Sequence, residues 1–326
     1  MTSKSAIRPL RPTHLVALRA LDCRPSCMEW TASTWPRVHD GDARLPLWSL
    51  LSQSMASPTG YRRAWVHCGP DGVDGIAAAR ARCGGLVWDV RHLSVDGANE
   101  PVARELLLWI CEEAASRGAR RVFIETGTEP GERAVAERTG FEQYTQARLY
   151  VRRGGAPPTV PALEGARLRQ RGDEHALFQL YKAAVPANVR AAEAMTLEEW
   201  AALHKGTKRW TPGPLDDRRQ HVWQDGEAAL AWMELTCNAK SQHVEWLVHP
   251  GHESASDGLV ACAIAGAGAR GPLYATCRDY QPSLCTALER AEFALVAERA
   301  VFARQLAVRV PERVLVAARA RPTLTR

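Results

Sequence analysis

The sequence of 326 residues has no long uninterrupted apolar run and no block of consecutive basic residues. No segment is long enough to span a bilayer, and the opening residues, MTSKSAIRPLRPTHL, lack the apolar core of a signal peptide. The formal net charge is +6, but the arginines are spread along the chain. We therefore expect a cytoplasmic protein without a membrane span, and the charge distribution does not favour nucleic-acid binding.

Several signatures of catalysis and metal binding are also missing. The sequence contains neither the P-loop pattern nor the G-x-S-x-G pattern of a serine nucleophile. Its nine cysteines are odd in number and lie mostly in apolar segments, which favours buried thiols in a reducing compartment. Cys23 and Cys27 have no second pair at metal-binding spacing, and no Pro-Cys-x-x-Cys follows the H-x-E of His243 and Glu245. We expect no metal site.

One stretch of the sequence, Val87 to Phe141, recurs in diverged form from Val244 to Phe293. In the first copy an apolar strand is followed by Val102, Leu106 and Ile110, which recur at helical spacing. The second copy has the same order of strand, loop, helix, strand and short helix. Because the elements recur in one order over this length, the repeat indicates duplication of a whole domain.

A connector separates the two copies. Residues 153–161 are rich in Gly and Pro and poor in apolar side chains, which is typical of a linker. With a boundary near Pro157, we expect two domains, residues 1–155 and 162–326, each large enough for its own core.

Two helices and one loop are predicted outside the repeat. Leu45 to Met55 has apolar residues at helical spacing, and Thr196 with Glu199 forms a capping box that starts a helix ending at His204. The basic segment from Lys205 to Arg219 contains Trp, Pro and Gly, and is either a flap over a site or an ordinary surface loop.

The order of predicted elements in each copy resembles that of the GNAT acyltransferase superfamily. Each copy has a strand, two helices, a hairpin, a strand leading through a loop into a long helix, a further strand, a short helix and closing strands. The resemblance covers residues 1–153 and 162–326. It implies an α/β (α+β) chain of two tandem GNAT-like domains, each a mixed, mostly antiparallel sheet flanked by helices.

The resemblance also implies a cosubstrate, acetyl-CoA or another acyl-CoA, and an acceptor amine on a small molecule or peptide. In the family, free N–H groups at the start of the long helix hold a pyrophosphate. The second copy keeps Val248-x-Pro250 and aligns Gly258 with a glycine of the family motif, whereas Pro101 replaces a glycine in the first copy. The cofactor-binding residues implied by the resemblance are Trp246, Leu247, Val248, Ser254, Ala255, Ser256, Asp257 and Gly258.

The catalytic residues implied by the resemblance lie in the second half, which we expect to be the catalytic half. Glu245 is the candidate general base, and His243 falls on the same strand face. The tyrosine that serves as the general acid in the family is replaced by Ala136 and Leu288 in the two copies. Tyr280 is therefore the candidate that could substitute for it. The other interpretation is that Glu245 and His243 form a solvated surface pair and Tyr280 a packing residue.

Carboxylates near the cofactor loop keep a second functional interpretation open. Glu100 and Glu253 stand near the family's Arg or Gln position, where a negative charge repels pyrophosphate. The alternative is a catalytically silent GNAT-like protein that binds a ligand or a protein partner. The sequence leaves the oligomeric state open, a homodimer included.

Overall fold

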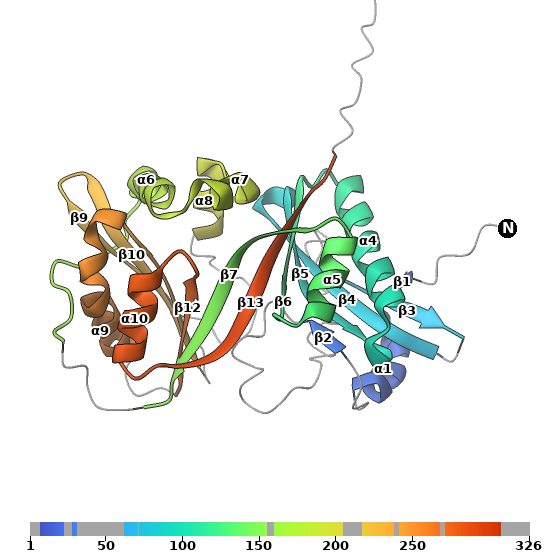
Figure 1. The fold of residues 1–326 in the computed structure, drawn as a ribbon. Helices are drawn as coiled ribbons and strands as arrows, with labels where there is room; N and C mark the ends of the chain where they lie inside the picture. The colour runs from blue at the N-terminus through green and yellow to red at the C-terminus, as the bar shows by residue number, and fades with distance from the viewer. Residues whose placement is uncertain are drawn as a thin grey trace, which may run out of the picture.

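The structure is a computed structural model, and it describes residues 7–22, 28–30, 62–70, 72–154, 160–204, 217–237, 241–267 and 271–307. These residues form one 13-stranded sheet with helices packed on it (Figure 1). The strand order is β1-β3-β4-β5-β6-β13-β7-β12-β11-β10-β9-β8, with β2 paired to β5. Among the described strands, only β5 with β6 and β11 with β12 are parallel pairs. The mixed, mostly antiparallel sheet predicted from the sequence is confirmed.

The two halves contribute equivalent elements in the same order. The first half contains β1 (Ile7–Pro9), η1 (Pro12–His14), α1 (Leu15–Asp22), β2 (Met28–Trp30), β3 (Arg62–Gly69), β4 (Gly72–Arg82), η2 (Cys83–Gly85), β5 (Val87–Val95), η3 (Asp96–Ala98), α4 (Glu100–Ser116), β6 (Arg121–Thr126), α5 (Pro130–Arg138) and β7 (Glu142–Arg152). The second half contains β8 (Arg167–Leu168), α6 (Glu174–Ala184), α7 (Ala187–Glu193), α8 (Leu197–His204), β9 (Asp217–Asp225), β10 (Ala228–Cys237), β11 (Gln242–Val248), η4 (Pro250–Ala255), α9 (Ser256–Ala267), β12 (Leu273–Arg278), α10 (Pro282–Arg290) and β13 (Ala294–Gln305).

The halves exchange their last strands. The second half's β13 lies between β6 and β7, and the first half's β7 lies between β13 and β12. Figure 1 shows these two long, twisted strands running side by side through the middle of the molecule. The two halves therefore share one continuous sheet, although the predicted boundary at Pro157 itself lies outside the described residues.

Each half has its own apolar layer between helices and sheet. Leu106, Leu107 and Ile110 on α4 are fully buried against β4 and β5, as their helical spacing predicts. In the second half, α9 and α10 pack in the same way on β10, β11 and β12. Burial of these side chains, each contributing about 2 kcal/mol, stabilises both layers.

A second group of helices, α6, α7 and α8, lies on the opposite face and reaches the first half. Helix α7 contacts β7, and α8 contacts η2. The predicted capping box is confirmed, because the Glu199 N–H donates to Thr196 Oγ1 and the Thr196 N–H donates to Glu199 Oε2, both at 3.1 Å. This cap fixes where α8 begins and hence where Glu199 points.

Parts of two predicted segments have a different outcome. Residues 217–219 belong to β9 and not to the predicted loop, because they pair with β10 and the Arg218 side chain bonds to Glu234. The rest of that loop, residues 205–216, and the predicted helix from Leu45 to Met55 lie outside the described residues.

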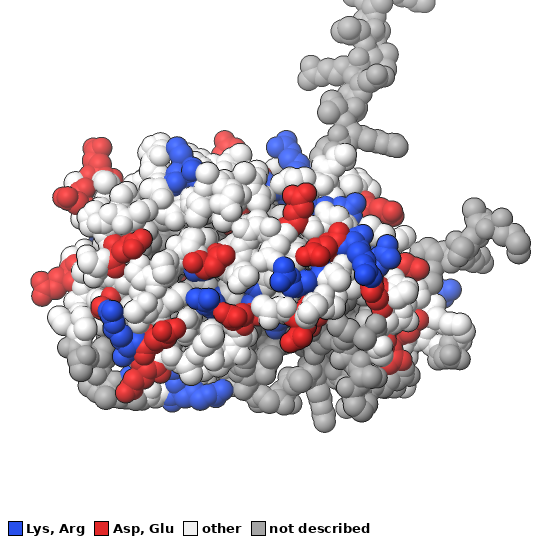
Figure 2. Space-filling model, in the orientation of Figure 1, with Lys and Arg blue, Asp and Glu red and all other residues white. Residues whose placement is uncertain are grey.

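The surface in Figure 2 shows acidic and basic side chains interspersed, without a large area of one sign on that face. No helix in the described ranges has the length and apolar character needed to cross a membrane. The seven cysteines in the described part of the chain form no disulfide.

His204, at the end of α8, gives the fold a measurable pH dependence. Its ring lies 4.2 Å from the ring of Trp200 and 5.1 Å from that of Trp232, and its Nδ1 is 2.8 Å from the Trp200 carbonyl oxygen. Burial lowers the pKa of His204 to about 4. Between pH 6.5 and about 4 the unfolded chain binds the extra proton, so stability decreases as the pH falls through this window, by about 2 to 3 kcal/mol.

The check is urea unfolding at several pH values on the wild type and on His204→Phe, which keeps an aromatic ring without a titratable group. We expect the free energy of unfolding of the variant to depend less steeply on pH, by the equivalent of about one bound proton. Burial also lowers the pKa of His92, to about 3, so the stability of both proteins keeps a pH dependence that comes from His92. An unchanged slope in the variant contradicts the assignment to His204.

Candidate functional site

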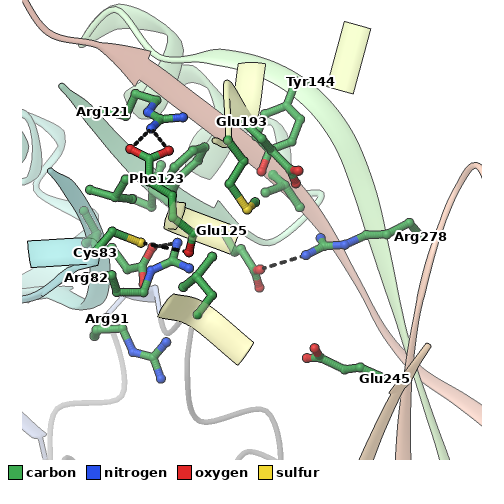
Figure 3. A pocket seen from close by; sticks show the side chains of 18 residues that line it. Arg82, Cys83, Arg91, Arg121, Phe123, Glu125, Tyr144, Glu193, Glu245 and Arg278 are labelled. Atoms are coloured by element: carbon green, nitrogen blue, oxygen red, sulfur yellow. Dashed lines mark hydrogen bonds and ion pairs between the residues drawn. The ribbon is translucent and has the colours of Figure 1, made fainter. Parts of the chain in front are cut away.

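A pocket of about 290 Å³ lies where the two halves meet (Figure 3). The first half supplies side chains from β4, β5, β6 and β7, and the second from α7, α8, β11, β12 and β13. The volume suits a small ligand. The pocket therefore depends on both halves and on the helices that cover the sheet.

In the first half, strands β5 and β6 part beside this pocket. Their parallel pairing ends at Asp89 and Phe123, while β5 runs on to Val95. A β-bulge at Arg91 shifts the register between β5 and β4. Beyond the parting, β2 pairs with residues 93–95, and it does so on the β6 side because β4 occupies the other edge. The chain itself thus fills the edge of β5 that the parting exposes.

In the second half, β11 and β12 part in the same way, but the edge stays open. Their pairing ends at Val244 and Ala275, and no other described strand pairs with that edge of β11. The register with β10 is regular along β11, without a bulge. The Gln281 side chain bridges the parting, since it donates to the Trp246 carbonyl at 3.1 Å and accepts from the Arg278 N–H at 3.0 Å.

Glu245 is the first residue of β11 past this parting. Its side chain is 56% exposed and lines the pocket. His243 lies on the same strand face, as predicted, with Nδ1 3.9 Å from Glu245 Oε1 and Nε2 2.7 Å from Thr276 Oγ1. Burial lowers the pKa of His243, against the opposing effect of Glu245. The imidazole is therefore neutral at pH 7, while Glu245 faces the pocket.

Tyr280, the candidate acid, lies in the turn before α10. It is half-buried and packs against the cluster formed by α6, α7 and α8. Burial raises the pKa of Tyr280, although Arg278 opposes the shift, so the phenol keeps its proton at pH 7. Ala136 and Leu288, at the family's tyrosine position, are buried in α5 and α10.

The predicted cofactor residues lie on the end of β11, in the 3-10 turn η4 and at the start of α9, which continues directly from η4. Trp246 and Leu247 are buried, whereas Val248 and Ala255 are half-buried and Ser254 is exposed. Within the turn, the Ser256 N–H and hydroxyl both donate to the Glu253 carbonyl.

Gly258 accommodates the chain that follows the connector. The Leu163 N–H donates to its carbonyl at 3.2 Å, and an added Cβ would lie 3.2 Å from Leu163 Cβ. The missing side chain therefore has a packing role, and its predicted role in cofactor binding stays a prediction.

Both long helices carry a carboxylate in their first turn, each paired with an arginine of the next helix. Asp257 on α9 accepts from Arg290 Nη1 at 2.9 Å, and Glu100 on α4 pairs with Arg138. The helix dipole favours a negative charge here. In each half, the position that holds pyrophosphate in the resembling family thus has an internal anion, although 67% of the Arg290 side chain is exposed.

In the pocket, two arginines are each paired with a carboxylate that balances their charge. Arg82 contacts both carboxylate oxygens of Asp89 at 2.5 Å. Arg121 Nη2 donates to both oxygens of Glu199 at 2.8 and 2.7 Å, and these two side chains are only 4% and 7% exposed. The second pair joins β6 of the first half to α8 of the second. Sequence reasoning identified Glu199 only as a helix cap.

Arg278 and Glu193 complete the polar wall, and neither was singled out from the sequence. Figure 3 shows Arg278 pointing across the pocket toward Glu125, with Glu245 below it. Glu193 accepts a hydrogen bond of 2.6 Å from Tyr181, and burial raises the pKa of its carboxyl. The available sequence signal for Arg278 was an arginine at the end of a strand, at an alternating polar position. This pattern is too common to identify a site.

No protein-family model matches this sequence, and a comparison with curated proteins finds no match. Among solved structures, the chain is similar to a GCN5-related N-acetyltransferase from Sphaerobacter thermophilus. The identity is 14%, the match covers 93% of this chain and 97% of that chain, and the TM-score is 0.56. A functionally unknown conserved protein from Staphylococcus epidermidis matches at 11% identity over 75% of this chain and 92% of that one, with a TM-score of 0.50.

A tandem GNAT protein from the clavulanic acid biosynthesis pathway also matches, at 15% identity over 75% of this chain and 82% of that one, with a TM-score of 0.45. The chain has the GNAT fold. The order of its elements recurs in the two halves, as predicted from the sequence. At these identities the similarity establishes the fold, so the function has to be argued from the site.

Proposed function

We propose that this protein is an N-acyltransferase that uses an acyl-CoA, acetyl-CoA in the first instance, to acylate an amine of a small molecule or peptide. The observation that carries the proposal is that β11 keeps an open edge where it separates from β12. Glu245 lies at the start of this open edge and lines the pocket. A carboxylate there is within reach of both an acyl group held along the edge and an amine entering the pocket. The second half is the catalytic half in this proposal.

Two features of the second half fit an acyl-CoA. The backbone groups of Trp246 and Val248 face the side of β11 away from β10, because the neighbouring His249 N–H bonds to β10, although the Trp246 carbonyl already accepts from the Gln281 side chain. A pantetheine arm can add to such an edge as an extra strand. Arg290 of α10 lies largely exposed beside the first turn of α9, and its side chain can exchange Asp257 for a phosphate. The equivalent edge in the first half is occupied by β2.

The chain's own residues then have defined roles. The Glu245 carboxylate accepts the proton that the attacking amine loses, directly or through one water. Neutral His243, held by Thr276, positions that water. Tyr280 keeps its proton at pH 7 and can donate it to the departing thiolate. Acyl-CoA supplies the activated thioester carbonyl when bound.

A second candidate function is supported by a different observation. Both halves place a paired carboxylate, Glu100 or Asp257, at the helix start where an anionic cofactor would bind. Internal anions at both positions favour a catalytically silent GNAT-like protein that binds a ligand or a protein partner. The two proposals differ in whether acetyl-CoA binds at all.

Calorimetric titration with acetyl-CoA separates them, and the duplicated fold supplies matched controls. We expect the wild type to bind. Arg290→Gln should weaken binding about 3- to 10-fold by removing a phosphate partner, and Asp257→Asn should strengthen it by a similar factor by removing a like charge. Glu100→Gln and Arg138→Gln make the same changes in the first half and should leave the affinity unchanged.

The outcomes are distinct. Absence of acetyl-CoA binding by the folded wild type overturns the acyltransferase proposal and leaves the silent protein. Changes confined to the Glu100 and Arg138 variants would move the cofactor site to the first half. Gly258 is a poor test position because any side chain there meets Leu163.

A further inference from the structure

Arg278 differs from two other arginines of the pocket, Arg82 and Arg121, in how closely a carboxylate approaches its guanidinium. Arg82 and Arg121 each hold a carboxylate by two contacts of 2.8 Å or less. The guanidinium of Arg278 has Glu125 Oε1 at 3.9 Å, which is beyond hydrogen-bond distance. Its buried Nη1 has no hydrogen-bond partner among the described residues, which is also true of Arg82 Nε and Arg121 Nη1, so the difference lies in the distance to the carboxylate. A buried donor in this state is costly, so the group is suited to an acceptor from outside the chain.

The guanidinium is nevertheless charged. Burial works against the charge, but Glu125 and Tyr144 outweigh it and hold the pKa of Arg278 above its ordinary value. A planar guanidinium with an unpartnered N–H group can bind a carboxylate through two parallel hydrogen bonds. A dianionic phosphate fits less well, because Glu125, Glu193 and Glu245 line the same pocket and repel extra negative charge.

Glu245 supplies an anion in the same cavity. Its carboxylate is 56% exposed, lines the same cavity and lies 3.9 Å from the nearest His243 nitrogen, so it has acceptor capacity left for an ammonium group. The same cavity is also lined by apolar side chains that include Phe123, Met195 and Val301. The pocket thus presents a cation, an apolar wall and an anion within about 290 Å³.

We propose that this pocket binds an amino acid, with Arg278 holding the α-carboxylate and Glu245 facing the amine. The cavity volume favours a single amino acid over a longer peptide. The inference rests on the proposed function in naming this molecule as the acceptor that is acylated. Binding of the amino acid itself does not depend on acyl transfer.

The test is a thermal-shift panel of the twenty proteinogenic amino acids against their α-amides, followed by calorimetry on those that bind. The amides keep the amine and side chain but lack the carboxylate. We expect at least one amino acid to bind and its amide to bind about 10- to 100-fold more weakly. Arg278→Gln should weaken binding of the amino acid by the same factor and leave the affinity for the amide unchanged.

Arg63→Gln is the matched control, because it removes a guanidinium from an ion pair with Glu113 on β3 and α4, outside the pocket. We expect it to bind the amino acid like the wild type. The inference is overturned if no amino acid binds, if the amide binds as tightly, or if Arg278→Gln binds like the wild type.

Acetyl-CoA titration on the same preparation keeps this inference separate from the proposed function. Acetyl-CoA binding without amino-acid selectivity overturns the amino-acid inference alone. Amino-acid binding without acetyl-CoA binding overturns the acyltransferase proposal, and Arg278 then belongs to a binding pocket.

Discussion

Replacing Glu245 by Gln should lower the rate of acyl transfer about 100- to 10,000-fold, the range expected for loss of a general base. The amide keeps the size of the side chain but cannot take the proton from the amine. Because the proposed function places the acyl donor on the β11 backbone and the first turn of α9, the affinity for acetyl-CoA should remain within about 2-fold of the wild type. The measurement is kcat with an acceptor found by screening, beside an acetyl-CoA titration of each protein.

Glu227→Gln provides the control, since it makes the same charge change at an exposed position between β9 and β10. We expect its kcat to match the wild type. If Glu245→Gln keeps wild-type turnover in an active enzyme, the base is another group. His243→Gln then becomes the informative variant, because His243 shares the strand face with Glu245.

Replacing Arg121 by Met should destabilise the protein by about 3 to 5 kcal/mol, the largest stability effect we expect from one substitution. The change leaves the Glu199 carboxylate buried without its cation between β6 and α8. Arg148→Met, which breaks a half-exposed pair with Glu298, should cost less than about 1 kcal/mol. Urea unfolding followed by tryptophan fluorescence measures both.

The double variant Arg121→Met with Glu199→Gln distinguishes a buried charge from a lost packing contact. Gln removes the stranded charge and still completes the capping box with Thr196. We expect it to recover at least about 1 kcal/mol of the loss. A double variant no more stable than Arg121→Met would mean that the cost comes from packing and not from the charge.

Much of the scaffold could be predicted because its signals are local. The buried Leu106, Leu107 and Ile110 follow from helical spacing, and the start of α8 follows from Thr196 and Glu199 three residues apart. Residues 217–219 were predicted wrongly as loop, because their charged side chains do not indicate a strand, which is stabilised by pairing with β10. Propensity does not record such pairing.

The candidate site could be predicted only in part. Glu245 and His243 share a face because alternation along a strand is a local property. Arg121 meets Glu199 across 78 positions, and Arg278 meets Glu125 only after the two halves join. The pocket was invisible for the same reason, since its walls come from both halves.

The order of elements and its recurrence predict, from the residues alone, a duplicated chain with a GNAT-like fold. Periodicity and capping depend on neighbours a few positions apart, so they are readable without the fold. The tertiary structure alone decided that β7 and β13 exchange places, that β2 fills one parted edge while β11 keeps the other open, and that Arg278 is left short of acceptors. Strand partners and the balance of buried charge depend on contacts between distant segments, which no local pattern contains.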